Sequence, residues 1–493
     1  MQLSRTQKWL LVIFIITLVT RLILAFTVPN LTYDSYFHLR QVDEITRTGT
    51  PLFEDPLSYG GRTLHYLPFF HYLVAFLNLF LPLGLLAKIV PNVLLSLLPF
   101  IVFALSKKIS NNETAALFSA FISGFLPILF TTNAFNPLSL FLPVAFFALY
   151  CFLNIDKRGF ALYFLLSFFI LSVTSSATFL LIVGFIIYFI LSVIEKKKIK
   201  KPELELIIFS VFFYIWIQFV FFKNVLISEG ARFIWQNVPT QILTQYFPQI
   251  SILNALLLVS IIPFIAGIFV VYQSLFQLQN QRAFLFISLV ISTTLFSWLR
   301  IIEFNLALSF FAIILAILFS LFYTYLSDLF AKTKISEFKK HLALIMVILL
   351  LPTTILPSIN FAEKQNTPLD SEIEAFTWLN EHTAKNAKVA GLLEEGHLIT
   401  YYAERKNLMD DQFNFIENSE DLFSDLNALF ATPFETQALD ITSQHGITYL
   451  VLTPHAQRKY GIKNFRYQTA RCFKKIYDEE TKIYQVDCIL DKK

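Results

Sequence analysis

The sequence is poor in the residues and short motifs that identify common enzyme classes. Only 15% of its residues are charged, and it has three cysteines in 493 residues. It contains no CxxC pair and no histidine and cysteine cluster with zinc-ligand spacing, which argues against a zinc site. Walker A, GxGxxG and GxSxG motifs are missing too, which argues against the nucleotide-binding and hydrolase classes that use them.

Hydrophobic runs fill the first 360 residues instead. The chain is 56% hydrophobic, with a mean hydropathy of +0.60, and apolar runs of about 18 residues or more are typical of membrane-spanning helices. The first run has no small-residue cleavage site after it, so we expect a retained span and not a signal peptide. We predict about eleven spans, near residues 9–28, 87–105, 113–131, 137–154, 159–175, 177–195, 203–222, 250–272, 283–299, 305–326 and 342–360.

Basic residues sort onto alternate loops between these spans. By the positive-inside rule these loops face the cytoplasm, which places the N-terminus inside and, with an odd number of spans, the C-terminal region outside. The apolar segment Tyr66 to Pro82 would break this pattern if it crossed the membrane. We therefore interpret it as an interfacial or re-entrant helix, with an ordinary span as the alternative.

The fold class that follows is a polytopic α-helical membrane domain with a small extracytoplasmic α/β domain. We assign residues 1–360 to the membrane domain, with external loops at 29–86 and 223–249, and residues 361–493 to the outer domain. The outer domain is predicted to alternate helices and strands, with helices at 370–382, 397–403, 421–430 and 435–444 and strands at 388–393, from 408, and at 447–452, 473–477 and 482–486.

Two cysteines flank the last predicted hairpin. Cys472 and Cys488 stand at nearly opposed positions, so a cross-strand disulfide outside the cytoplasm is one expectation and two free thiols are the other. Cys151 lies within a predicted span.

Chemically versatile residues gather just beyond the first span, between Tyr33 and Arg40. Asp34 could hold a metal ion or take a proton from an acceptor. Group transfer from a lipid phosphate would need an acid or metal at the leaving phosphate and a base at the nucleophile, both at the membrane face. Asp34 suits the base, and the guanidinium of Arg300, at the external end of a span, suits the phosphate.

These features resemble the catalytic subunit of oligosaccharyltransferases, the archaeal or bacterial single-subunit type of GT-C glycosyltransferase. The resemblance rests on the first span, on Asp34 with the aromatic, histidine and arginine residues after it, on the long first external loop, and on the run from Gly396 to Arg405. That run is similar to the segment around the end of the family's WWDYG acceptor-binding motif, whose glycine falls on Gly396 and whose following histidine falls on His397.

The resemblance implies transfer of a sugar or oligosaccharide from a polyprenyl or dolichyl (pyro)phosphate donor to an extracytoplasmic protein or glycan acceptor, by a multi-pass protein of the cell membrane. It implies membrane lipid and the lipid-linked sugar as partners, and no nucleic acid. The implied site residues are Asp34 and His38 in catalysis, Arg300 and Arg40 at the donor phosphate, Gln245, Glu395, Gly396 and His397 on the acceptor side, and Asp34, Asn133 and Asn136 at a divalent metal, Mg²⁺ or Mn²⁺.

The chain departs from the family at several motif positions. Leu392-Leu393-Glu394-Glu395 stands where the family has Trp-Trp-Asp-Tyr, which argues against standard sequon recognition. Asn133 and Asn136 stand where an Asp-x-Asp-like pair normally binds metal, and Gln245 replaces a glutamate. Because neutral amide oxygens are poorer ligands for Mg²⁺ or Mn²⁺ than carboxylates, a metal-independent mechanism is open.

Structural interpretations of the same residues are also open. Asp34 could cap the helix that begins near Ser35, Arg300 could pair with Glu303, and Arg21 within the first span could have a structural role. The alternative function is a catalytically inactive paralogue that binds lipid-linked glycan or scaffolds a partner. A transporter or flippase is disfavoured, because few intramembrane charges mark a translocation path.

Overall fold

The chain folds into two compact units in the computed structural model, which describes residues 4–197, 199–230, 251–278, 281–299, 301–332, 338–413, 415–469 and 471–490. The first unit contains residues 1–29, 66–223 and 250–365, and the second contains residues 30–65, 224–249 and 366–493. The stretch around Asp34 therefore groups with the C-terminal region. The predicted domain boundary after residue 360 stays a prediction.

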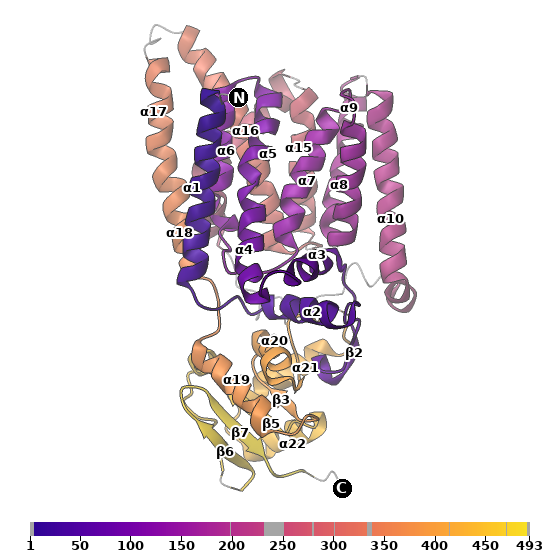
Figure 1. Ribbon diagram of the computed structural model, residues 1–493, viewed down its shortest axis with the longest axis vertical. Coiled ribbons are helices and arrows are strands. Elements are labelled where there is room, and N and C mark those ends of the chain that lie inside the picture. The colour runs from indigo at the N-terminus through magenta and orange to yellow at the C-terminus, as the bar shows by residue number, and fades with distance from the viewer. Residues whose placement is uncertain are drawn as a thin grey trace. The chain divides into compact units, whose positions relative to one another are not determined.

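The first unit is a bundle of apolar helices that run side by side (Figure 1). These helices carry apolar side chains around nearly their whole circumference, as expected of helices that face either lipid or one another. The helices are α1 (Arg5–Thr27), α3 (Phe69–Asn78), α4 (Leu83–Ser96), α5 (Leu98–Ser110), α6 (Glu113–Gly124), α7 (Leu138–Leu153), α8 (Phe160–Thr174), α9 (Phe179–Ile194), α10 (Lys201–Glu229), α13 (Ile252–Val259), α14 (Ile261–Gln273), α15 (Gln281–Trp298), α16 (Phe304–Lys332), α17 (Phe338–Leu350) and α18 (Leu356–Glu363).

Six helices within the described residues are long and apolar enough to cross a membrane, or seven if α13 and α14, bent by 90° at Ser260, form one span. This number is smaller than the predicted eleven, because several of the predicted apolar runs form helices that are too short to cross the membrane. The helix α6 has 12 residues and α8 has 15, which reach about 18 and 22 Å against a hydrocarbon core of about 30 Å. The count of eleven and the sidedness of the membrane stay predictions.

The segment from Tyr66 to Pro82 contains the short helix α3. It has 10 residues, about 15 Å at the usual rise, and lies across the direction of the long helices of its unit (Figure 1). Its length is half of what a span requires, which agrees with the interfacial interpretation.

The second unit is built on a five-stranded sheet with the strand order β4-β3-β5-β7-β6. The strand β3 is parallel to both β4 and β5, whereas β7 is antiparallel to β5 and β6. The strands are β3 (Lys388–Ala390), β4 (Lys406–Asn407), β5 (Tyr449–Leu452), β6 (Phe473–Asp478) and β7 (Lys482–Val486). A two-stranded ribbon of β1 (Glu54–Asp55) and β2 (Arg62–Thr63) belongs to the same unit.

Helices complete the second unit and agree well with the sequence patterns. They are α2 (Ser35–Thr48), α19 (Asp370–His382), α20 (Gly396–Leu398), α21 (Ser419–Ala431), α22 (Glu435–His445) and α23 (Pro454–Tyr460), and the helical turns Ser58–Gly60, Leu393–Glu395 and Ile399–Ala403 lie between them. The predicted helix at 370–382 and the predicted hairpin are confirmed. The helix α23, which Thr453 caps by accepting the N–H of Ala456, was not predicted.

The hairpin carries a disulfide between Cys472 and Cys488. Of the two alternatives that the spacing allowed, the structure has the cross-strand bond. Cys151 is a free, buried cysteine of the first unit.

Candidate functional site

Asp34 is the residue immediately before α2, and its side chain makes no capping hydrogen bond to that helix. Its carboxylate instead accepts a hydrogen bond from Thr32 Oγ1 at 2.5 Å, and the same hydroxyl lies 2.7 Å from Ser35 Oγ. The structure therefore does not support side-chain capping as the reason for an aspartate at this position. The hydroxyl of Thr32 orients one carboxylate oxygen.

The helix α2 is held by an apolar face against the segment from Gly396 to Ala403. The ring of Tyr36 lies 5.6 Å from that of Tyr401 and 5.4 Å from that of Tyr402, and the ring of Phe37 lies 5.4 Å from that of His397. Five apolar side chains of α2 are buried: Tyr36, Phe37, Leu39, Val42 and Ile45. The last three recur at every third position and so share one face of the helix. This packing fixes the direction in which α2 leaves Asp34.

Two further residues of α2 were predicted to act at the site. His38 is half-buried, and its ring meets the ring of Phe37 edge-on at 5.1 Å. Arg40 forms a two-pronged ion pair with Asp55, Nη1 to Oδ2 at 2.7 Å and Nη2 to Oδ1 at 2.8 Å. Asp55 also accepts the backbone N–H of Leu57. In this geometry the guanidinium fork of Arg40 anchors the loop that follows α2.

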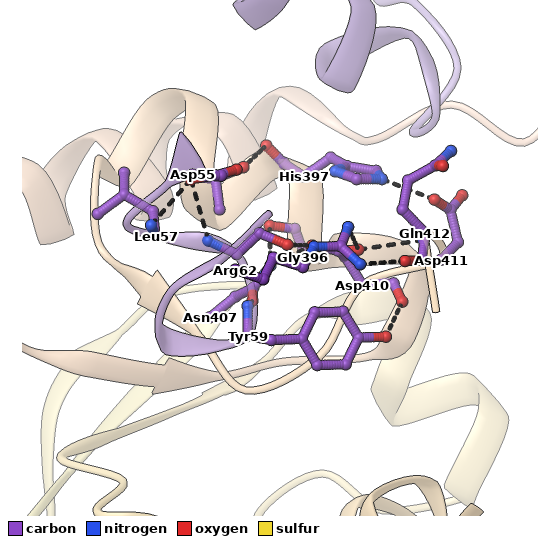
Figure 2. Close-up of polar contacts among 12 residues, drawn as sticks. Asp55, Leu57, Tyr59, Arg62, Gly396, His397, Asn407, Asp410, Asp411 and Gln412 are labelled. Atoms are coloured by element: carbon purple, nitrogen blue, oxygen red, sulfur yellow. Dashed lines mark hydrogen bonds and ion pairs between the residues drawn. The ribbon is translucent and has the colours of Figure 1, made fainter. Parts of the chain in front are cut away.

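A buried polar cluster ties that loop to the C-terminal region (Figure 2). We call it the Arg62 cluster, and its members are Ser58, Arg62, His397, Asn407, Asp410 and Asp411. Asp410 Oδ2 accepts from Ser58 Oγ at 2.6 Å and from Asn407 Nδ2 at 2.9 Å. Asp410 Oδ1 accepts from the N–H of Gln412 at 3.1 Å and lies 3.3 Å from Arg62 Nη2.

The charges of this cluster balance one another. Burial by itself lowers the pKa of His397, but the carboxylates of Asp411 and Asp410 raise it by more, so the net shift is upward. Burial raises the pKa of Asp410, but the charges of His397 and Arg62 bring it below its usual value. His397 Nε2 lies 2.6 Å from Asp411 Oδ1. When His397 is protonated, it and Arg62 together balance the charges of the two carboxylates.

His397, Asp410 and Asp411 are also a group that could hold a metal ion, because their ligand atoms lie within 4.8 Å of one another. Histidine and carboxylate ligands suit several divalent metals. Binding would have to displace the hydrogen bonds that both oxygens of Asp410 accept, and it would place a cation next to Arg62. We therefore interpret the group as an internal ion-pair network.

The positions that correspond to Trp-Trp-Asp-Tyr of the family face the interior. Leu392 and Leu393 belong to the hydrophobic core of the second unit. Gly396 is closely packed, since a Cβ there would meet the carbonyl oxygen of Met409 at 2.3 Å and Cβ of Asp410 at 2.5 Å. Close packing is by itself a sufficient reason for glycine at this position.

A second group of ionisable residues is buried beside this segment. Glu372 Oε2 accepts from the hydroxyl of Tyr33 at 2.6 Å, and Glu395 accepts from the backbone N–H of Leu392 and from the hydroxyl of Thr453. Burial raises the pKa of Glu372. Burial, with the charge of Glu372, raises the pKa of Glu395 well above its ordinary value. Their burial beside one another therefore disfavours the charged forms of both carboxyl groups.

The remaining predicted site residues are spread over the first unit and the undescribed parts of the chain. The side chain of Asn133 donates to the carbonyl oxygen of Val28 at 3.1 Å, and its Oδ1 accepts from Thr132. The backbone carbonyl oxygen of Asn136 accepts a hydrogen bond from the hydroxyl of Ser139. Arg300 and Gln245 lie outside the described residues, and so does most of the loop at 223–249. The predicted roles of all these residues stay predictions.

The sequence did not reveal the charged partners of the Arg62 cluster. Arg62 begins the two-residue strand β2, which no sequence pattern predicted, and Asp410 and Asp411 come after the short strand β4. The signal that could have found them is the pair of adjacent acidic residues that starts three positions after the end of β4, within about one strand and turn of His397 in the sequence.

The comparisons with known proteins give one sequence relative and several structural ones. No protein-family profile matches the chain. Dolichyl-phosphooligosaccharide-protein glycotransferase 2 of Archaeoglobus fulgidus is 35% identical over 101 residues, which are 20% of this chain. The match spans only 17% of that relative's length.

The similar structures cover almost the whole chain. The apo oligosaccharyltransferase of Archaeoglobus fulgidus aligns with a TM-score of 0.70 at 14% identity, over 91% of this chain and 70% of that one. The oligosaccharyltransferase AglB of that organism, in complex with an inhibitory peptide and a dolichol-phosphate, gives 0.66 at 15% identity, over 91% and 70%. ArnT of Cupriavidus metallidurans, bound to undecaprenyl phosphate, gives 0.59 at 10% identity, over 98% of both chains. The chain thus has the GT-C fold of the oligosaccharyltransferases and ArnT, which confirms the resemblance drawn from its sequence.

Proposed function

We propose that this chain is a membrane glycosyltransferase that moves a sugar from a polyprenyl- or dolichyl-linked phosphate donor to an acceptor on the outer face of the cell membrane. The observation that carries the proposal is the likeness of fold to an oligosaccharyltransferase along 91% of the chain. The donor class follows from the ligands of two similar structures, dolichol-phosphate and undecaprenyl phosphate. Both are long isoprenoid phosphates, which suit a protein with apolar helices.

Asp34 is the residue that we assign to the acceptor. In the transfer step an oxygen or nitrogen of the acceptor bonds to the anomeric carbon of the sugar. The bond from that carbon to the donor phosphate breaks, and its electron pair leaves with the lipid phosphate. The carboxylate of Asp34 takes the proton that the acceptor loses. The hydrogen bond from Thr32 Oγ1 holds the carboxylate in one orientation before the step.

The leaving phosphate needs a cation, and the two predicted arginines differ in this respect. Arg40 already uses both Nη atoms on Asp55, so phosphate binding would have to break a two-pronged ion pair. A guanidinium that binds two phosphate oxygens suits the task, and we assign this role to Arg300, which lies outside the described residues.

The metal site that the family implies does not suit the residues of this chain. Its ligands would be one carboxylate, from Asp34, and two neutral amides, from Asn133 and Asn136. The amide of Asn133 is engaged at both ends, since Nδ2 donates to Val28 and Oδ1 accepts from Thr132. Carboxylates are what Mg²⁺ prefers in proteins. The proposed transfer step therefore relies on side chains of the protein alone.

An inactive, glycan-binding paralogue is the second candidate. It is favoured by the internal hydrogen bonds of Asn133 and by the burial of Leu392 and Leu393 in the core. At these positions the family has side chains that act on the metal or the acceptor, and this chain has side chains that are engaged inside the protein. The experiment below separates the two functions.

The test is sugar transfer by the full-length protein in liposomes, supplied with lipid-linked sugars and candidate acceptors, with and without Mn²⁺. For an enzyme, we expect Asp34→Asn to lower the rate by about 10²-fold or more. The control is Glu44→Gln on the same helix, where the glutamate pairs with the exposed Arg47, and we expect this variant to keep the rate. No turnover of any donor, with donor binding that survives Asp34→Asn, would establish the inactive paralogue.

A further inference from the structure

One stretch of the first unit is buried but not helical. It runs from Phe125 to Pro137, between α6 and α7, and contains only a single helical turn at Pro127–Leu129. Apart from Thr131, Asn136 and Pro137, its residues are buried. Irregular backbone at membrane depth persists only where protein groups satisfy its polar atoms. The hydrogen-bond partners of this stretch, which we call the 125–137 loop, therefore decide its shape.

Side chains from elsewhere in the unit meet the free carbonyls of the loop one by one. Arg21 Nη1 of α1 donates to Leu129 O at 2.8 Å, and Asn92 Nδ2 of α4 donates to Thr132 O at 2.8 Å. Gln365 Nε2 donates to Phe130 O at 2.8 Å, and Ser358 Oγ of α18 donates to Phe125 O at 2.8 Å. Four side chains thus hold four carbonyls of one loop.

Arg21 connects two of these contacts. Its Nε donates to Asn92 Oδ1 at 3.1 Å, so it also orients the amide that holds Thr132. Its guanidinium carbon lies 5.0 Å from the centre of the Phe130 ring, which allows a cation–π contact. The side chain is 1% exposed, and Nη2 makes no hydrogen bond to the described residues.

An arginine in this position is hard to explain by stability alone. The contacts of this buried guanidinium are a carbonyl oxygen, an amide oxygen and an aromatic ring, and no carboxylate pairs with it among the described residues. Charges at membrane depth are costly and mark function by default. What the arginine supplies is a planar set of donors that reaches the loop and Asn92 together.

We infer that Arg21 is a positioning residue that fixes the 125–137 loop and, through it, Asn133 and Asn136. This goes beyond the proposed function, whose transfer step uses neither of these amides. The loop matches the one that carries the family's metal-binding pair, and Arg21 determines its shape whether or not a sugar is transferred. The backbone N–H of Asn133 donates to Gln365 Oε1 at 3.1 Å, and the side-chain Nδ2 of Asn133 donates to the carbonyl oxygen of Val28. The loop is thereby held before Thr132, at Leu129 and Phe130, and after it, at Asn133.

The test uses the full-length protein with a cysteine introduced in the loop, by Thr131→Cys. Thr131 is half-buried, Cys151 is buried, and Cys472 and Cys488 form a disulfide, so the new thiol is the reactive one among the described residues. The background is then combined with Arg21→Met or with Arg21→Lys. The matched control is Thr17→Val, one turn earlier on α1, where the buried hydroxyl has no hydrogen-bond partner among the described residues.

We expect Arg21→Met to speed thiol labelling of Thr131→Cys by about tenfold or more, since a lost charge-assisted hydrogen bond raises local opening by such factors. Arg21→Lys should give an intermediate rate, because it keeps the charge and loses the planar fork. Thr17→Val should label like the parent. Equal labelling rates in Arg21→Met and the parent, with both proteins monodisperse, would overturn the inference.

Two further measurements keep the outcome decisive. If Arg21→Met does not fold, Gln365→Ala removes another contact to the same loop from a half-buried position after α18, and it should also speed labelling. Transfer by the same variants then separates the two proposals. Faster labelling with no transfer even by the parent would refute the proposed function and leave the role of Arg21 in the loop standing.

Discussion

The guanidinium of Arg62 lies 3.3 Å from the carboxylate of Asp410, although 348 residues separate them. The same arginine lies over the ring of Tyr59 at 4.8 Å, and the hydroxyl of Tyr59 donates to the carbonyl oxygen of Asp410 at 2.7 Å. These contacts fasten the loop around β1 and β2 to the C-terminal region. Asp34 belongs to the same compact unit as these residues of the C-terminal region.

Breaking the pair between Arg62 and Asp410 should strongly destabilise the second unit. Their side chains are 9% and 0% exposed, and removal of one partner of a buried pair leaves an uncompensated charge, at a cost of about 3–5 kcal/mol. We expect this loss for Arg62→Met, and a smaller loss for the double variant with Asp410→Asn. Hydrogen exchange of the amides in β3 and β5 under denaturant measures it.

The control for this prediction is Arg47→Met. Arg47 pairs with Glu44 at 2.7 Å, but its side chain is 74% exposed, and exposed pairs contribute less than about 1 kcal/mol. Equal losses in Arg47→Met and Arg62→Met would contradict the role assigned to burial.

Stability of the second unit should fall as the pH rises through the folded-state pKa of His397. Its pKa is raised when folded, so the folded state holds the proton more tightly than the unfolded state. The stabilisation is complete below the ordinary value of about 6.5 and is lost as the folded state loses the proton. Thermal unfolding between pH 6 and 9 should show this fall in the parent and a flatter curve in His397→Gln. The same slope in both proteins would argue against it.

Replacement of Glu395 by glutamine should stabilise the protein at alkaline pH. The pKa of this carboxyl is raised well above its ordinary value by burial and by Glu372, so ionisation works against the folded state once the pH exceeds about 4.3. We expect Glu395→Gln to have a higher Tm than the parent at pH 8, and this advantage to shrink toward pH 4. Glu381→Gln on α19, where the glutamate is exposed, serves as the comparison, and an advantage that does not change with pH would refute the assignment.

Loss of the disulfide should lower the stability of the hairpin. Cys472 and Cys488 are 16 residues apart, and closing a loop of this size stabilises the folded state by about 3 kcal/mol. We expect the double variant Cys472→Ser and Cys488→Ser to unfold at lower denaturant concentration by this amount. Treatment of the parent with a reductant should have the same effect, and no effect on the variant. A parent that resists reduction but matches the variant in stability would show that the bond contributes little.

The sequence predicted the second unit more closely than the first. The strands near 449–452 and 482–486 and the helix at 370–382 were readable, because alternating or helical spacing of apolar residues is a local property. The spans were harder, since uniform apolar runs such as that of α8 show where a helix forms but not where it ends or bends. Among the site residues, the structure gave Arg40 a partner, Asp55, that no local pattern could indicate.

The sequence by itself determined that this is a protein of apolar helices with a small α/β unit, and that Asp34 follows the first long helix. It also showed the resemblance to the GT-C enzymes, because the short motifs that carry this resemblance are each contiguous in the sequence. Only the tertiary structure decided that Arg62 meets Asp410, that Arg21 holds the carbonyl of Leu129, and that Leu392 and Leu393 lie in a core. The physical reason is distance along the chain: periodicity reports neighbours within a few turns, whereas these contacts join residues that only the folded topology brings together.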